Sequence, residues 1–149
     1  MFRAGRAPRA ENDVATLSVL LVDDNPHFLR ILSRFLSAHS EGTLRVVGSV
    51  MGGRDALARA ERQRPNVILV GLMMVDVPGL QLLPQLRRTS PDAILIALSL
   101  IDFDPYRNDA LAAGADAFVS KMCLERDLLP TIQQFASRAP RLGMIPLEG

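Results

Sequence analysis

The chain has 149 residues, the size of one ordinary domain, and is long enough to bury a substantial core. Hydrophobic residues make up 48% of it and its formal net charge is +1. This composition argues against a wholly disordered chain and neither favours nor excludes a nucleic-acid partner. No apolar run is long enough to span a bilayer, so we expect a soluble protein. Cys123 is the only cysteine, which excludes an internal disulfide and fits a reducing cytoplasm.

The first predicted elements, in chain order, are a tail, a strand and a helix. Residues 1–16 contain arginines but no continuous apolar core, which excludes a secretory signal and favours a flexible tail. Residues 17–22 are an apolar run that stops at Asp23 and Asp24, as a buried strand would. Pro26 is compatible with the first turn of a helix. The apolar residues that follow have helical spacing: Phe28, Ile31, Leu32, Phe35 and Leu36.

The same alternation of strand and helix continues to residue 137. Further strands are predicted at 44–50, 66–70, 93–99 and 116–120. Further helices are predicted at 52–64, 80–88, 104–114 and 124–137. Gly114 is expected to cap the fourth helix, and Pro84 is expected either in the first turn of the third helix or at a kink. Residues 138–149 show no periodicity, so we expect a C-terminal tail there.

Five apolar strands that alternate with five helices predict an α/β fold. The arrangement is three-layered, with helices on both faces of a doubly wound, five-stranded parallel sheet. Right-handed crossovers leave few topologies for such a sheet, and functional groups collect at the carboxyl ends of its strands. The residues at four of those ends are therefore candidates: Asp23 and Asp24, Gly71, Ser99, and Lys121.

Four sequence blocks resemble the receiver domain of bacterial two-component response regulators. They are LLVDDNP, NVILVGLMMVDVPGLQLL, ILIALS and ALAAGADAFVSK, in the order and spacing of that family, within residues 17–137. The resemblance is closest to receivers joined to helix-turn-helix DNA-binding domains of the LuxR or NarL type. It implies a CheY-like, flavodoxin-like sheet with strand order 2-1-3-4-5 and a role in phosphorelay signal transduction.

The resemblance also implies that the phosphoacceptor position is altered. The family's phosphoacceptor aspartate falls at Gly71, which has no side chain to accept a phosphoryl group. Val75 and Met122 stand where the family usually has prolines. The glycine has two interpretations. Either it reflects a neutral loss of activity, with no special need of the backbone for glycine, or it permits a ligand or another chain segment to approach closely. We favour the first interpretation.

The rest of the family's acidic pocket is retained as a remnant. The resemblance makes Asp24 the direct magnesium ligand and Asp23 a helper through water or the lysine. It makes Ser99 the hydroxyl that moves toward the phosphoryl group, Lys121 its charge partner and Phe118 the switch aromatic. Loss of one carboxylate should leave magnesium binding weak or absent, so we expect no cofactor. Lys121 and the acid pair are then free to form an ion-pair cluster without metal, and Ser99 to bond backbone groups.

We therefore predict a pseudo-receiver that is not an enzyme and that acts by protein contacts without phosphorylation. One alternative is a working phosphoreceiver with Asp76 or Ser99 as the acceptor. Another is a small-ligand sensor or enzyme on a flavodoxin-like sheet, although the chain has no glycine-rich phosphate loop.

The partner is expected to be a protein or a second copy of the chain. Receivers of this family often pair through the fourth helix, fifth strand and fifth helix, and Ile101, Phe103 and Tyr106 would supply apolar anchors there. We expect no direct nucleic-acid binding by this chain and no membrane contact.

Overall fold

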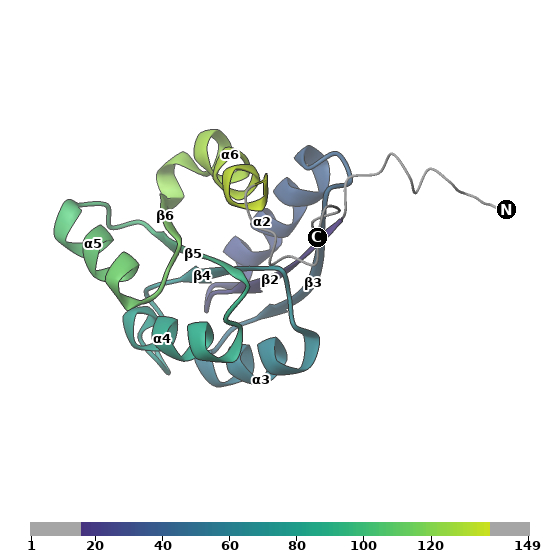
Figure 1. The fold of residues 1–149 in the computed structure, drawn as a ribbon. Coiled ribbons are helices and arrows are strands. Elements are labelled where there is room, and N and C mark those ends of the chain that lie inside the picture. The colour runs from purple at the N-terminus through teal and green to yellow at the C-terminus, as the bar shows by residue number, and fades with distance from the viewer. Residues whose placement is uncertain (1–15, 138–149) are drawn as a thin grey trace, which may run out of the picture.

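The computed structural model describes residues 16–137, in which strands and helices alternate (Figure 1). The strands are β2 (Leu17–Val22), β3 (Leu44–Val50), β4 (Val67–Gly71), β5 (Ile94–Ser99) and β6 (Ala117–Ser120). The helices are α2 (Pro26–His39), α3 (Gly53–Gln63), α4 (Gly79–Thr89), α5 (Asp104–Ala113) and α6 (Leu124–Ser137), with a 3-10 turn η1 (Lys121–Cys123) before α6. No helix in this part of the chain is both long and apolar enough to cross a membrane.

The five strands form one parallel sheet in the order β3-β2-β4-β5-β6. This order confirms the predicted strand order 2-1-3-4-5 and the predicted fold class. In the register of the central strands, Val70 of β4 lies beside Val22 of β2 on one side and Ala97 of β5 on the other. The carboxyl ends of these three strands therefore lie next to one another, as expected of a site at this edge.

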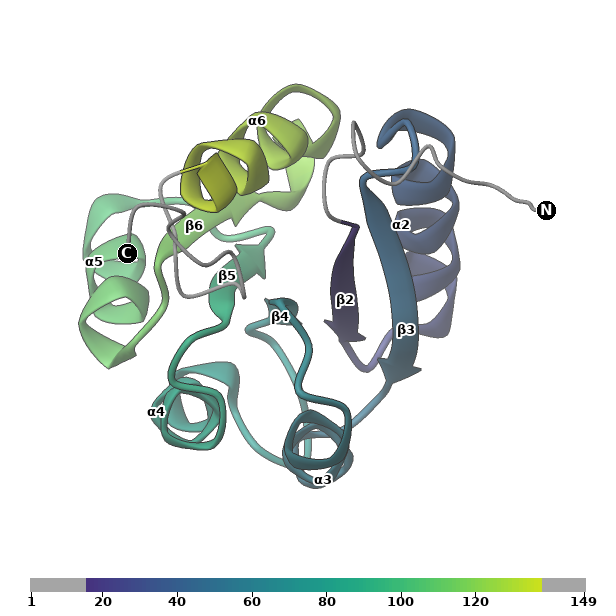
Figure 2. The same cartoon turned by 45° about the vertical axis from the view of Figure 1, so that its right-hand side comes forward.

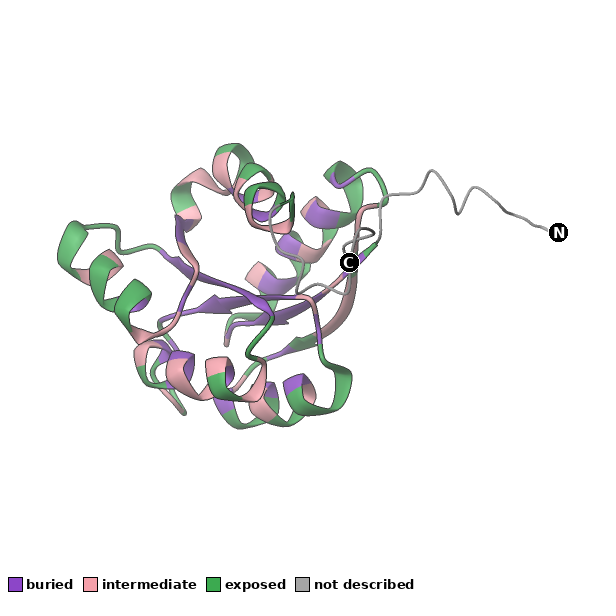
Figure 3. Ribbon diagram, viewed as in Figure 1, coloured by how far each residue is buried: buried purple, intermediate pink, exposed green. Residues whose placement is uncertain are grey.

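Helices cover both faces of the sheet. Figure 2 shows α2 and α6 on one face, and α3 and α4 on the other with α5 beside β6. Two apolar cores result, one packed against α2 and α6 and the other against α3, α4 and α5. Every residue of β4 and β5 is buried, which explains the unbroken apolar runs of these strands (Figure 3).

Helix ends follow the local sequence signals. The Asn25 side chain accepts hydrogen bonds from the N–H groups of His27 and Phe28 at 3.0 and 3.2 Å, and Pro26 occupies the first turn of α2. Gly114 ends α5 with φ of 129°, as predicted for a C-cap. Pro84 lies inside α4, beyond its first turn. The predicted tails at 1–16 and 138–149 lie outside the described residues, apart from Thr16.

Candidate functional site

The carboxyl edge of the sheet brings together Asp23 and Lys121 from opposite ends of the chain. Asp23 follows β2 and Lys121 follows β6, and Lys121 Nζ lies 2.7 Å from Asp23 Oδ2. Only 16% of the lysine side chain and 5% of the aspartate side chain are exposed. This is a shielded ion pair, so removal of either partner leaves a charge that water reaches poorly.

Further contacts fix both members of the ion pair. Asp23 Oδ1 accepts a hydrogen bond from the Asn25 N–H at 3.0 Å, so both oxygens of this carboxylate have a partner. Lys121 Nζ also lies over the Phe28 ring, 4.1 Å from its centroid. The ammonium group is thus held between a carboxylate and an aromatic face.

Gly71 lies directly beside the Asp23 carboxyl group. A Cβ on Gly71 would stand 2.8 Å from Asp23 Cγ and closer still to Oδ2, so the Asp23 carboxyl group would have to shift to admit it. Gly71 is not among the residues with positive φ, so conformational freedom is not the reason for this glycine. Gly71 therefore shows no special backbone need, as expected, and the Asp23 carboxyl group occupies the space that a side chain would fill.

Asp24 points to a different part of the edge. Its Oδ2 accepts a hydrogen bond from the Val75 N–H at 3.2 Å, which ties the end of β2 to the loop between β4 and α4. The predicted ion-pair cluster is thus confirmed for Asp23 and wrong for Asp24, which lies outside it.

The donor set at this edge does not fit a magnesium ion. Mg²⁺ needs several oxygen ligands in near-octahedral geometry. Lys121 and Asn25 already occupy the Asp23 carboxylate, and Val75 engages that of Asp24. Within residues 16–137, His, Cys, Asp and Glu side chains form no group of three or more that could hold a metal.

Ser99 and Phe118 are both buried and both engaged. Ser99 Oγ accepts a hydrogen bond from the Ile101 N–H at 3.0 Å, so its predicted backbone-capping role is confirmed. Phe118 meets the Tyr106 ring edge-on at 6.2 Å, and the Arg107 guanidinium lies 4.7 Å from its ring centroid. Burial raises the pKa of Tyr106. These contacts hold the Phe118 side chain in the interior.

Asp76 has a structural role that the sequence prediction missed. Its carboxylate accepts hydrogen bonds from the Gly53 N–H, at 2.9 and 3.1 Å to its two oxygens, and from the Val77 N–H at 2.7 Å. The bond from Gly53, the first residue of α3, is the main reason that the pKa of Asp76 lies below its usual value. Gly52, the N-cap of α3, has no side chain that could accept a hydrogen bond from the first N–H groups of the helix. A glycine at this position was therefore the sequence signal that a residue distant in the chain caps α3.

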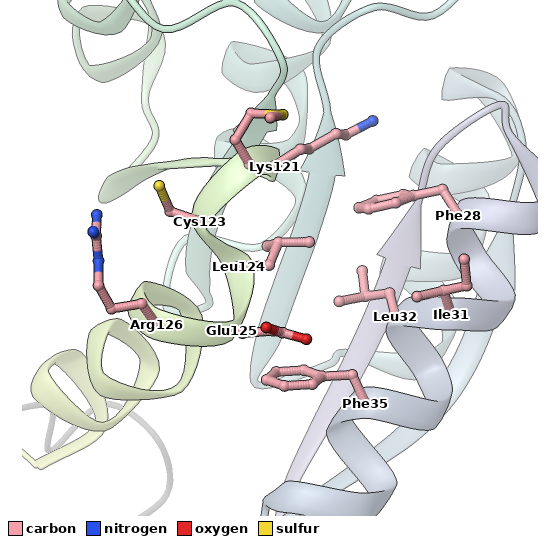
Figure 4. Close-up of a pocket in the computed structure, with 10 residues that line it drawn as sticks. Phe28, Ile31, Leu32, Phe35, Lys121, Cys123, Leu124, Glu125 and Arg126 are labelled. Carbon is pink, nitrogen blue, oxygen red and sulfur yellow. The ribbon is translucent and has the colours of Figure 1, made fainter.

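A groove of about 440 Å³ opens beside Lys121, between α2 and the start of α6. Figure 4 shows Phe28, Leu32 and Phe35 of α2 facing Leu124 of α6 across it. The groove is mainly apolar, and Lys121, Glu125 and Arg126 contribute charges to its lining.

Comparison with known proteins gives the family. The profile described as the response regulator receiver domain matches residues 19–133. The chain belongs to the response regulator receiver domain family. The match covers all five strands of the sheet except the first two residues of β2, and includes every residue of the candidate site.

Relatives of this receiver include the response regulator protein VraR of Staphylococcus aureus. The two are 32% identical over 121 residues, which cover 80% of the receiver chain and 56% of VraR. The chain thus spans about half the length of the curated relatives it matches.

Solved structures agree with the fold of the receiver. The signal receiver domain of NarL from Mycobacterium tuberculosis superposes with a TM-score of 0.75 at 25% identity, over 84% of this chain and 99% of that one. A LuxR-family response regulator from Aurantimonas sp. SI85-9A1 also gives a TM-score of 0.75, at 20% identity, over 87% of this chain and 94% of that one. The receiver is therefore close to those of the LuxR and NarL type.

Proposed function

We propose that this receiver signals without accepting a phosphoryl group, through contacts with a protein partner. Its role in a two-component response regulator follows from the family; the lack of phosphorylation is the proposal. The observation that carries it is the ion pair of Asp23 and Lys121 next to Gly71. The position that the resemblance assigns to the phosphoacceptor has no side chain, and the pocket's lysine and acid neutralise each other.

Two other residues were candidates for the acceptor, and their contacts argue against both. The Asp76 carboxylate is bonded to backbone N–H groups at the start of α3 and in its own loop. Ser99 is buried, its hydroxyl accepts a bond from Ile101, and it is not a carboxylate that forms an acyl phosphate. Neither has an oxygen bonded to Lys121, the cation expected to neutralise a transferred phosphoryl group.

The same edge argues against chemistry of another class. An enzyme needs a nucleophile or base placed beside its activating partner. Here Asp23 and Lys121 are bonded to each other rather than to a nucleophile. The carboxylates of Asp23 and Asp24 do not fit a metal ion. We therefore propose neither an enzyme nor a metal-dependent sensor.

We also propose that the partner contacts the loop between β5 and α5. Phe103 is 53% exposed and Ile101 is 39% exposed, as an apolar anchor requires. Tyr106 is only partly exposed, and its ring meets those of Phe103 and Phe118. Of the three expected anchors, Ile101 and Phe103 are the exposed ones, and the Tyr106 ring stacks on that of Phe103.

Intact-protein mass spectrometry after incubation with acetyl phosphate and Mg²⁺ tests the proposal. We expect no added phosphoryl group, because no carboxylate stands free beside Lys121. A stoichiometric gain of one phosphoryl group would overturn the proposal. Asp76→Ala and Ser99→Ala variants would then show which side chain carries it.

A further inference from the structure

Most of the large hydrophobic side chains that residues 16–137 expose lie on the loops at the carboxyl edge of the sheet. They follow four different strands: Met51 after β3, Met73 and Val75 after β4, Leu100 and Phe103 after β5, and Met122 after β6. Val75 is 91% exposed and Met122 is 76% exposed. Exposed apolar side chains that gather on one face mark a surface for binding, whereas single ones scattered over a protein do not.

This face contains a hollow between the β4–α4 loop and α5, which we call the loop hollow. Its volume is about 340 Å³, and its walls are apolar except for the phenol of Tyr106. They include Leu72, Met73, Val75, Pro78, Leu80 and Tyr106. The Tyr106 hydroxyl lies 3.7 Å from Met73 Sδ, so the two sides of the hollow meet there. A space at the small end of the range for ligand pockets suits one anchoring side chain better than a whole small molecule.

Three aspartates lie on or next to the segments that form the loop hollow, and none of them is among the residues that line it. Asp24 contacts the hollow's loop at Val75, Asp76 lies next in that loop, and Asp104 begins α5 two residues before Tyr106. The cations Lys121 and Arg107 on the same edge are both held in ion pairs at 2.7 Å, with Asp23 and Asp102. Arg54 is followed directly by Asp55 and adds no net charge.

We propose that the loop hollow binds a basic, amphipathic segment of a partner protein, with an apolar side chain in the hollow and cations beside the three carboxylates. Methionines suit such a surface, because their flexible side chains adapt to different apolar shapes. The carboxylates of these segments disfavour anionic lipid and nucleic acid, and an isologous contact with a second copy would bring like charges together. This inference rests on the proposed function and names the chemistry of its partner.

The test is the binding of a designed helical peptide of leucine and lysine to the full chain, followed by fluorescence anisotropy without phosphodonor. We expect saturable binding that weakens as salt is added, and no binding of the same peptide with glutamate in place of lysine. Met73→Gln should weaken binding about tenfold, because burial of one methionine side chain is lost. Asp104→Asn should weaken it mainly at low salt.

Ile31→Gln is the matched control. Ile31 is 63% exposed, against 61% for Met73, but it lies on α2 beside the groove of Figure 4. We expect this variant to bind like the wild type. Loss of binding in Ile31→Gln but not in Met73→Gln would place the peptide in that groove and overturn the inference. Val75→Ser is a second variant of the hollow, with a side chain too exposed for its loss to disturb folding.

Three further results would overturn the inference. These are equal binding of the lysine and glutamate peptides, binding of phosphatidylglycerol vesicles in place of the peptide, and self-association that Met73→Gln abolishes. None of them bears on phosphorylation. Conversely, phosphorylation by acetyl phosphate would overturn the proposed function, but it would not change the result of the peptide-binding measurement.

Discussion

The missing side chain of Gly71 lets the Asp23 carboxyl group lie over the end of β4, within reach of Lys121. Each residue of this trio depends on the others: the glycine provides space, the aspartate fills it, and the lysine compensates the aspartate's charge. Any side chain at position 71 must first displace Asp23. The cost of a substitution there is therefore set by a neighbour rather than by the backbone of Gly71.

Gly71→Ala tests this dependence. The new Cβ should push the Asp23 carboxyl group away from Lys121, and we expect the free energy of unfolding to fall by about 1–3 kcal/mol, as in other overpacked sites. Urea denaturation measures the change. Asp23→Ser alone should also destabilise the protein, because Lys121 loses its partner.

The double variant Gly71→Ala with Asp23→Ser is the control. The serine side chain is shorter and leaves room for the Cβ, so the double variant should lose less stability than the sum of the two single variants. Strict additivity would mean that Gly71 and Asp23 do not share this space.

At the scale of single elements, long-range caps and clamps hold helix ends in place. Asp76 caps α3 from the β4–α4 loop. Arg87, near the end of α4, donates hydrogen bonds to the carbonyl oxygens of Ala93 at 2.8 Å and Gly114 at 3.0 Å, and forms an ion pair with Asp116 at 2.8 Å. One side chain thus joins the end of α4 to the turns before β5 and β6.

Arg87→Met should destabilise the protein by about 2–3 kcal/mol. The methionine keeps much of the apolar stem but removes every hydrogen bond of a partly buried, charged group. Arg88→Met is the control: Arg88 is exposed, and its replacement should change the free energy of unfolding by less than about 0.5 kcal/mol. Equal urea midpoints for the two variants would show that Arg87 is no clamp.

Asp76→Asn should change how stability depends on pH. The folded-state pKa of Asp76 is lowered, so its ionised form contributes stability above its unfolded value of 3.8, and this contribution is lost as pH falls through the lower folded pKa. The wild type should be more stable than Asp76→Asn at neutral pH, and the difference should shrink in acid. Urea midpoints at several pH values measure it, and a constant difference would contradict the role of the charge.

The elements could be predicted from the sequence because each carries its own local signal. The bounds of β2, β3 and α6 were predicted to the residue, since apolar runs and helical spacing end there at clear changes of pattern. The contacts of Asp76 and Gly71 could not be predicted in this way. Asp76 contacts the backbone of Gly53, and Gly71 lies beside the side chain of Asp23. In each pair the two residues are more than twenty positions apart and come together only in the folded protein.

At the scale of the whole molecule, the parallel sheet brings loops from four strands to one edge, where polar and apolar groups are separated. The ion pair of Asp23 and Lys121 is shielded, while Met73, Val75 and Met122 are exposed around it. An edge whose central charges are paired, and whose exposed side chains include several apolar ones, suits a protein contact better than a hydrated, charged phosphate.

A final prediction asks whether this edge is still able to bind metal once a carboxylate is restored. Gly71→Asp must move Asp23 from its place and adds a third carboxylate near Asp23 and Asp24. Without metal, the clash and the like charges should lower the melting temperature below that of the wild type. With Mg²⁺, the three carboxylates provide ligands that the wild type does not have free, and binding to the folded state alone would restore about 2.7 kcal/mol at a hundredfold excess over Kd.

Thermal melts of the wild type, Gly71→Asp and Gly71→Asn, each with and without Mg²⁺ and beryllofluoride, make this measurement. Asparagine has nearly the same shape as aspartate but no charge, so Gly71→Asn should show the steric loss and no recovery with metal. A rise with Mg²⁺ confined to Gly71→Asp is the expected result. An equal rise in the wild type would contradict the conclusion that Asp23 and Asp24 do not fit magnesium. No response in a folded Gly71→Asp variant would mean that Lys121 holds Asp23 too firmly for a metal to recruit it.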